Sequence, residues 1–147
     1  MKGYTLAEED LNCHGRVDGW IKRFKAVLDM DLPFNKVGMA HLTCDKIAPT
    51  REEYIKVLEL LPEDEMVGLF KKAAKLGVGI ELNSFDMNFA EDETDVVLRP
   101  YRIAKECGCK FYLGSDAHHP DRLDCAKAIF ERAVDLLNLT EDNKFII

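Results

Sequence analysis

Residues 110–120, KFYLGSDAHHP, decide how the rest of this sequence is interpreted. Residues 110–113 are mostly aromatic and apolar, and a glycine follows them, which is typical of a short buried strand. The chain then turns at Gly114 and presents Asp116 and His118. Because residues two apart in an extended segment point the same way, this carboxylate and this imidazole would project together from the strand end. Such a pair suits zinc, manganese or iron.

The same Asp-x-His pattern also fits a polar turn between a strand and a helix. In that interpretation Asp116 or Asp121 caps the helix that follows, and no ligand is bound. The choice between the two interpretations depends on what the other predicted strand ends carry.

The composition is that of an ordinary globular protein. A length of 147 residues predicts one domain, residues 1–147, and an apolar fraction of 47% is typical of a folded chain. The net charge of −7 disfavours non-specific binding to nucleic acid or to an anionic membrane. An anionic substrate stays compatible with this charge, because bound metal ions can invert it locally.

Neither a membrane anchor nor a disulfide framework is predicted. No apolar run is long enough to span a bilayer, and residues 1–5 lack the apolar core of a signal peptide, so we expect a cytoplasmic protein. The cysteines show no framework or zinc-finger spacing and are predicted to be reduced, mostly buried thiols. They are Cys13, Cys44, Cys107, Cys109 and Cys125.

Predicted strands alternate with predicted helices, which indicates an α/β fold with a parallel sheet. The strands are expected at residues 10–13, 36–42, 78–83 and 110–113, and the helices at 17–28, 50–61, 63–76, 99–107 and 121–139. The last residues, 144–147, fit either a final edge strand or a short apolar plug. Active sites of parallel α/β folds lie at the carboxyl ends of the strands, and the candidate residues stand there.

Four residues near these strand ends have side chains that bind divalent metals, namely His14, His41, Asp116 and His118. Each has an ordinary alternative; His41, for example, also fits a core histidine bonded to backbone. Asn83, at the end of its strand, either satisfies the loop backbone or contacts a ligand.

Several strand ends resemble motifs of the polymerase and histidinol phosphatase (PHP) family of metal-dependent phosphoesterases. Residues 37–42, VGMAHL, resemble a family strand that ends in a metal-binding histidine. Residues 79–84, GIELNS, resemble its Glu-[Ile/Leu]-Asn strand end, and residues 114–118, GSDAH, its closing motif. Residues 12–15, NCHG, resemble another family strand end with a histidine. The resemblance extends over roughly residues 10–139, with the motifs in the family's order.

The resemblance implies a distorted barrel of parallel strands with outer helices, and up to three divalent metal ions (zinc, manganese or iron) at the strand ends. Carried over, Asp116 would bind one ion, His41 and His14 a second, and His118 a third. Asp116 and His118 would be the catalytic residues, and Asn83 would lie beside the substrate phosphate. The implied reaction is hydrolysis of a small phosphomonoester, as in a histidinol-phosphatase-like enzyme, by a metal-activated water.

The chain departs from the family at its N-terminal side. PHP domains begin with His-x-His, a further histidine and a bridging acid, whereas this chain has four histidines and no His-x-His. We therefore expect a partial barrel that lacks the N-terminal His-x-His portion and an incomplete site, since a catalytic zinc usually has three protein ligands. This leaves open whether the chain is an enzyme or a non-catalytic, PHP-derived scaffold or interaction module. A third class, the amidohydrolases, would require a carboxylated lysine or additional histidines as metal ligands, which the chain does not supply.

An open half-barrel would expose an edge strand and an apolar interior, which predicts homo-oligomers formed through that edge. The other expected partner is a small phosphorylated substrate, with no nucleic acid and no membrane. The sequence chooses neither the substrate nor the metal.

Overall fold

The structure, a computed structural model, describes residues 11–44 and 47–146. Its helices are α1 (Cys13–Leu28), α2 (Arg51–Leu60), α3 (Glu63–Leu76), α4 (Thr94–Glu106) and α5 (Leu123–Leu136), and its strands are β1 (Gly38–Met39), β2 (Gly79–Asn83) and β3 (Lys110–Gly114). Short 3-10 turns lie at Phe34–Lys36, Glu91–Glu93, Pro120–Arg122 and Glu141–Asn143.

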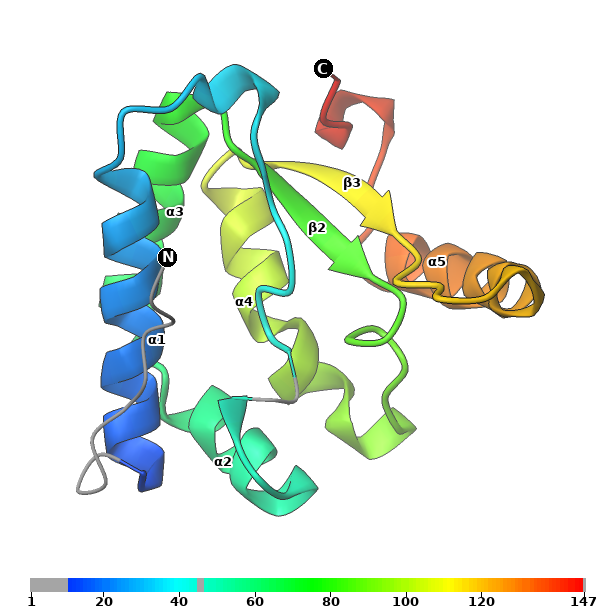
Figure 1. Ribbon diagram of the computed structural model, residues 1–147, viewed down its shortest axis with the longest axis horizontal. Helices are drawn as coiled ribbons and strands as arrows, with labels where there is room; N and C mark the ends of the chain where they lie inside the picture. Colours follow the sequence, from blue (N-terminus) through cyan, green and yellow to red (C-terminus); the bar gives the residue numbers. More distant parts are fainter. Residues whose placement is uncertain (1–10, 45–46, 147) are drawn as a thin grey trace.

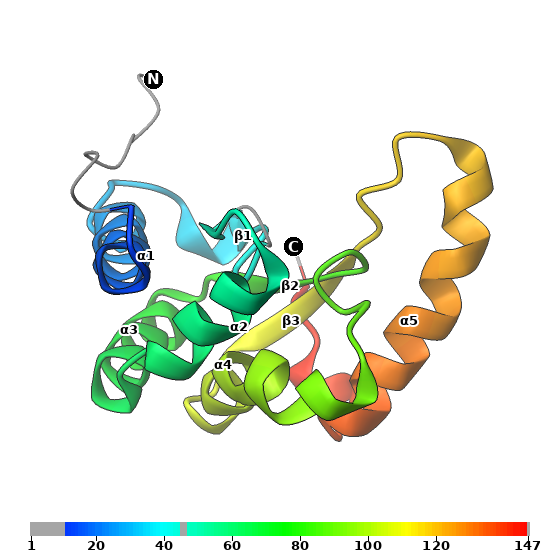
Figure 2. The same cartoon turned by 90° about the horizontal axis from the view of Figure 1, so that it is seen from below.

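The three strands form a parallel sheet in the order β1-β2-β3; Figure 1 labels β2 and β3, and Figure 2 labels all three. Gly38 pairs with Gly79, and Asn83 pairs with Gly114, so the carboxyl ends of β2 and β3 are level. The predicted α/β class and parallel sheet are confirmed. The expected barrel is not formed by the described residues, because three strands are too few to close a parallel sheet that takes about eight.

The core lies where the helices pack against the central strand. All five residues of β2 are buried, as expected for a parallel strand covered on both faces. Helix α1 packs on α2 and α3, and its Phe24 meets Phe70 of α3 edge-to-face, with ring centroids 5.3 Å apart. Trp20 contacts Phe24 in the same geometry at 5.2 Å. This aromatic cluster fixes α1 beside the edge of the sheet at which β1 lies.

Local signals place the helix ends of α2 and α3 as predicted. The Thr50 hydroxyl accepts a hydrogen bond of 3.2 Å from the backbone N–H of Glu53, which caps α2. Pro62 precedes α3, and Gly77 ends it with a left-handed φ of +83°.

Several predicted boundaries were wrong. Strand β1 contains only Gly38–Met39 of the predicted residues 36–42, and α1 begins at Cys13 rather than at residue 17. Helix α4 begins at Thr94 rather than at residue 99, so Pro100 lies inside it. The acidic turn Glu91–Glu93 starts this helix, because negative charge is favourable at a helix N-terminus. The strand expected at residues 10–13 is absent from the described part, since Asn12 caps α1 by accepting a hydrogen bond of 2.9 Å from Gly15 N–H. Residue 10 itself lies outside the described residues.

The C-terminal segment combines the two alternatives left by the sequence. Lys144 forms a single parallel bridge with Phe111, and the N–H of Phe145 donates a 2.7 Å hydrogen bond to the Phe111 carbonyl oxygen. The Phe145 ring then packs beside Tyr112 and fills the space next to Gly79. The segment therefore begins as an edge pairing on β3 and continues as an apolar plug; residue 147 lies outside the described residues.

The cysteines form no disulfide, although they are less buried than predicted. Cys109 is buried, Cys125 is exposed, and the other three are half-buried. Within the described residues, no helix combines the length and the apolar character that crossing a bilayer requires.

Candidate metal centre

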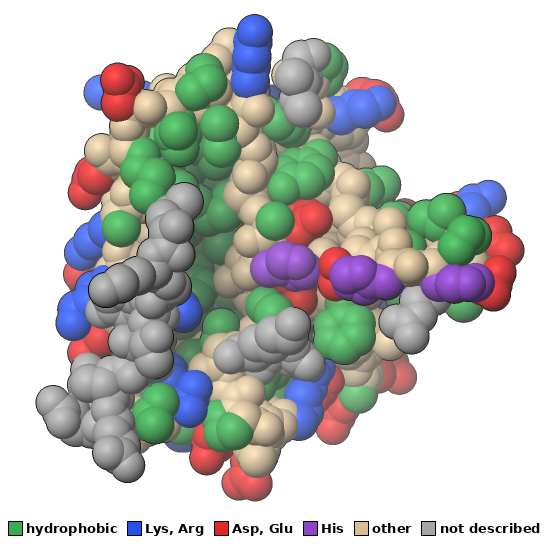
Figure 3. Space-filling model, in the orientation of Figure 1, with side chains coloured by type: hydrophobic (Ala, Val, Ile, Leu, Met, Phe, Trp, Pro, Cys, Tyr) green, Lys and Arg blue, Asp and Glu red, His purple; other side chains and the backbone are tan. Residues whose placement is uncertain are grey.

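Histidine and carboxylate side chains gather where the chain leaves the carboxyl ends of β1 and β3. His41 follows β1, and Asp116 and His118 follow β3. The Nε2 atom of His41 lies 3.9 Å from Oδ1 of Asp116, and Nε2 of His118 lies 3.6 Å from the same oxygen. Figure 3 shows histidine side chains in a row across this face of the molecule, with acidic side chains beside them. The structure thus brings together three of the residues that the sequence selected.

Each histidine of this group lies at a distance from Asp116 that fits two ligands of one cation, although the three ligand atoms are not all within 4.8 Å of one another. Separations of 3.6 and 3.9 Å exceed normal hydrogen-bond lengths. Nitrogen and oxygen ligands that lie about 2.0–2.2 Å from one ion are themselves roughly 3–4 Å apart. The group is open to solvent, since the His118 side chain is 85% exposed. We refer to His41, Asp116 and His118 as the strand-end group.

Two members of the strand-end group have an unusual backbone conformation. His41 has a φ of +53° and Asp116 a φ of +48°. The left-handed region costs a non-glycine residue about 1–2 kcal/mol, and such strain concentrates at functional sites. Both residues stand where a strand ends and the backbone turns.

Glu81 of β2 supports the turn at His41. Its side chain is buried, and Oε2 accepts hydrogen bonds from the backbone N–H of His41 at 2.8 Å and from Nδ2 of Asn83 at 3.3 Å. A backbone N–H and a side-chain amide are therefore the hydrogen-bond partners of this buried carboxylate. Gly114 on β3 leaves the necessary space, because a Cβ there would lie 1.8 Å from Oε1 of Glu81.

Asn83 is used inside the fold. Its Oδ1 accepts a hydrogen bond of 2.9 Å from the N–H of Phe85, while its Nδ2 donates to Glu81. Only 1% of the residue is exposed. Of the two interpretations of Asn83, the structure shows the one in which it satisfies the loop backbone.

The loop after β3 is tied to the loop after β2 by serines. The Ser84 hydroxyl donates a hydrogen bond of 2.6 Å to the carbonyl oxygen of Ser115, and the Ser115 hydroxyl accepts one of 3.3 Å from the N–H of Ala117. These bonds surround Asp116 and hold its backbone in the turn.

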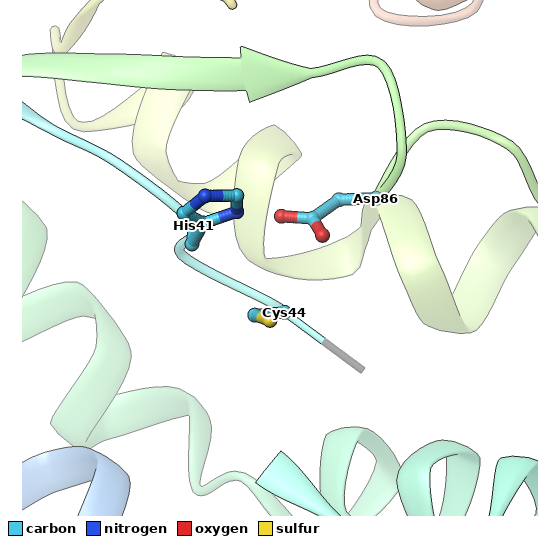
Figure 4. A group of neighbouring side chains, drawn as sticks. All are labelled: His41, Cys44 and Asp86. Atoms are coloured by element: carbon cyan, nitrogen blue, oxygen red, sulfur yellow. The ribbon is translucent and has the colours of Figure 1, made fainter. Parts of the chain in front are cut away.

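A second group of potential ligands shares His41 with the strand-end group. One ligand atom each from His41, Cys44 and Asp86 lies within 4.8 Å of the other two (Figure 4). Cys44 comes from the loop after β1, and Asp86 from the loop after β2. This cluster, which we call the thiol group, could hold a metal ion.

Sequence reasoning missed Cys44 and Asp86 as ligands. Cys44 belongs to the cysteines that are predicted to be reduced, mostly buried thiols, and Asp86 is one of several polar residues in the loop from 84 to 94. The available signal was spacing, because Cys44 stands three residues after His41, as metal ligands on one turn often do. No local signal brings Asp86 to them.

Buried hydroxyl groups lie beneath the thiol group. The hydroxyls of Thr43 and Tyr101 are 2.8 Å apart, and both residues are fully buried. Burial, reinforced by the negative charge of Asp86, raises the pKa of Tyr101 well above its usual value. Burial likewise raises the pKa of Tyr54 to about 12. The base of this site therefore consists of protonated phenols beside a carboxylate.

His14 is not at a strand end. It lies in the first turn of α1 and is exposed. In Figures 1 and 2, α1 runs on the opposite side of the molecule from the carboxyl end of β3. The role predicted for His14 required a strand that ends just before it, whereas in the structure helix α1 begins there, capped by Asn12.

A comparison of the chain with protein-family models, with curated proteins and with solved structures finds no match.

Proposed function

We propose that the chain is a metal-dependent phosphoesterase of PHP type that hydrolyses a small phosphomonoester and carries part of the PHP metal site. The observation that supports this proposal most is the approach of His41 and His118 to the same oxygen of Asp116, at 3.9 and 3.6 Å. These residues come from two strand ends whose sequences resemble PHP motifs. In this proposal the three parallel strands correspond to a segment of the family's barrel.

The residues of the strand-end group supply suitable ligands for a divalent cation. Asp116 offers a carboxylate oxygen, and His41 and His118 each offer an imidazole nitrogen. A divalent cation bound there lowers the pKa of a water molecule and neutralises charge on the phosphoryl oxygens. Glu81 orients His41 through its backbone, and the serine hydrogen bonds hold the turn at Asp116. An ion bound to Asp116, with one histidine or with both after a small movement of their exposed side chains, would keep coordination positions for water and for a phosphate.

A cavity beside His41 offers room for the rest of a small substrate. Its volume is about 320 Å³, near the lower end of the range for ligand pockets. Apolar side chains, including Trp20, Phe24 and Met39, form most of its lining, and His41 and Arg23 also border it. A phosphate bound at the strand-end group would leave an apolar substituent free to enter this cavity.

The test measures metal content and phosphomonoester hydrolysis on the same sample. The purified chain is stripped with a chelator, reloaded with zinc, manganese or iron(II), analysed for bound metal and assayed with p-nitrophenyl phosphate. We expect metal-dependent turnover that is abolished in Asp116→Asn and in His41→Ala, with unchanged circular dichroism. His119→Ala is the matched control, since His119 pairs with Asp121 outside the strand-end group. A wild-type rate in either site variant would contradict the assigned roles.

The second candidate function is that of a non-catalytic scaffold or interaction module derived from the PHP fold. The openness of the strand-end group favours it, because the largely exposed His118 is a weakly fixed ligand. In that case the chain folds, and no metal supports turnover in the assay above.

A further inference from the structure

We propose that His41, Cys44 and Asp86 form a zinc site in which the Cys44 thiolate is a ligand. This proposal concerns metal binding alone, and it holds whether or not the chain hydrolyses phosphate esters. The three side chains differ in chemistry and supply sulfur, nitrogen and oxygen within 4.8 Å of one another. Zinc accepts this combination of ligands, and three protein ligands with one open position is the arrangement of catalytic zinc.

The distances require only a small adjustment to enclose an ion. Zinc lies about 2.3 Å from sulfur and about 2.0–2.2 Å from nitrogen or oxygen, so tetrahedral ligand atoms are roughly 3.4–3.7 Å apart. The ligand atoms, which now lie within 4.8 Å of one another, therefore have to approach by about 1 Å at most. His41 is exposed and Cys44 half-buried, so their side chains have room to move toward Asp86, which is 4% exposed. Figure 4 shows the Asp86 carboxylate and the His41 ring facing each other.

The backbone brings His41 and Cys44 together on one turn. The N–H of Cys44 points to the carbonyl oxygen of His41 at 3.4 Å, and the N–H of Ile47 donates to the Cys44 carbonyl oxygen at 3.0 Å. The buried contact between the hydroxyls of Thr43 and Tyr101 anchors the middle of the turn to α4. Two ligands three residues apart on an anchored turn form a defined half of a metal site.

Asp86 is held from the opposite side by a turn of its own. The N–H of Met87 donates a hydrogen bond of 2.9 Å to the carbonyl oxygen of Asn83, the last residue of β2, and this bond closes the turn that contains Asp86. Farther along the loop, Arg132 of α5 donates to the Phe89 carbonyl oxygen at 2.9 Å, with its guanidinium 4.5 Å from the centre of the Phe89 ring. The loop that carries Asp86 is therefore held by the central strand and by α5, whereas the turn that carries the other two ligands is held by α4.

The ligand types indicate which cation the site prefers. Thiolate is a soft ligand that favours zinc, whereas magnesium and manganese prefer sites built from oxygen. The strand-end group contains imidazole and carboxylate and lacks a thiol, so the two groups differ in selectivity. Because His41 belongs to both, an ion in the thiol group draws one imidazole away from Asp116.

Cobalt(II) provides the most direct probe, because thiolate coordination gives a charge-transfer absorption band in the near ultraviolet. The reduced, metal-free full chain is titrated with cobalt(II), and zinc is then added to displace it. We expect one equivalent of cobalt to produce the band and zinc to remove it. Manganese at the same concentration should leave the band unchanged.

Variants identify the ligands. We expect Cys44→Ser to remove the band and to weaken zinc binding at least tenfold, and Asp86→Asn to keep a band while weakening zinc binding at least tenfold. Cys125→Ser, at an exposed cysteine of α5, and His119→Ala, at a histidine that pairs with Asp121 outside both ligand groups, are the matched controls and should behave like wild type. Circular dichroism checks folding; if Asp86→Asn unfolds, the Cys44 and Cys125 variants decide the question.

The proposal is overturned if the band survives Cys44→Ser, if it disappears in Cys125→Ser, or if wild type shows no band. Its failure is separate from that of the proposed phosphoesterase. A zinc-binding chain without turnover contradicts only the enzyme, and turnover with a metal that gives no thiolate band contradicts only the zinc site.

Discussion

The backbone N–H of His41 donates a hydrogen bond of 2.8 Å to the side-chain carboxylate of Glu81. This bond joins the loop after β1 to the middle of β2 and fixes a histidine whose φ is +53°. Hydrogen bonds to a charged acceptor are shorter and stronger than neutral ones. The orientation of His41 therefore depends on a buried residue that belongs to neither ligand group.

Replacing Glu81 should loosen this arrangement. We expect Glu81→Ala to lower the free energy of unfolding by about 1–3 kcal/mol, because the His41 N–H and the Asn83 amide lose their acceptor. Glu81→Gln should lose less, since its amide oxygen still accepts one hydrogen bond. Urea denaturation of the three proteins measures the difference, and equal midpoints for wild type and Glu81→Ala would contradict the role of this carboxylate.

Any side chain at position 114 should lower the stability of the fold. The Cβ of an alanine there would lie 1.8 Å from Oε1 of Glu81, so the carboxylate has to leave its place. We expect Gly114→Ala to destabilise the fold by about 1–3 kcal/mol, as overpacking does. Gly68→Ala is the control, because Gly68 lies inside α3 with no atom near its missing Cβ. That change should stabilise the protein by about 0.5–1 kcal/mol in the same denaturation assay.

The left-handed backbone at Asp116 predicts an inverted preference between glycine and alanine. With a φ of +48°, we expect Asp116→Gly to be more stable than Asp116→Ala by about 1 kcal/mol. At Asp18, exposed within α1, the order should reverse, because glycine costs a helix about 1 kcal/mol relative to alanine. Thermal or urea unfolding of the four variants tests this, and the same order at both positions would refute the strain at Asp116.

Alkaline pH should destabilise the protein, because one thiol and two phenols keep their protons more firmly in the folded state than in the unfolded state. Burial raises the pKa of the Cys109 thiol, of the Tyr54 phenol and of the Tyr112 phenol to about 12 each. In the unfolded chain these groups lose their protons near pH ~8.5 for cysteine and ~10 for tyrosine. The folded state then binds more protons than the unfolded state, so stability falls as pH rises from about 8.5 to about 12.

Urea midpoints measured across that pH range check this prediction, and Cys109→Ala serves as the control. Because the alanine has no proton to lose, its stability should fall less steeply in the first part of the range. A constant midpoint for wild type throughout the range would show that these groups titrate alike in both states.

The elements with strong local signals could be predicted from sequence, and the nonlocal features could not. Strand β2, helix α3 with its glycine end, and the strand that leads to Asp116 each follow from apolar pattern and turn residues. The meeting of His41 and Asp116 follows from one further rule, that parallel strands end on the same side.

Residues 12–15 show why the rest was missed. An asparagine before an apolar periodic segment fits both a strand exit and a helix cap, and only the hydrogen bond to Gly15 N–H decides for the helix. Asp86 reaches Cys44 and His41 through the packing of one loop on another, which no residue spacing encodes. Whether the sheet closes into a barrel likewise depends on how many strands it contains, which no single segment of the sequence reveals.

Helix α5 is fastened at one end. The Lys105 ammonium of α4 donates hydrogen bonds of 2.9 and 2.8 Å to the carbonyl oxygens of Leu137 and Asn138, just past the C-terminus of α5. At the other end Leu123 is 53% exposed, and Figure 2 shows the first turns projecting away from the sheet. Amide protons should therefore exchange with solvent sooner in the first turns of α5 than in its last turns. The loop that carries Asp116 and His118 leads into this loosely packed end, so two of the three residues of the strand-end group are next to the part of α5 that has the fewest packing contacts to hold it.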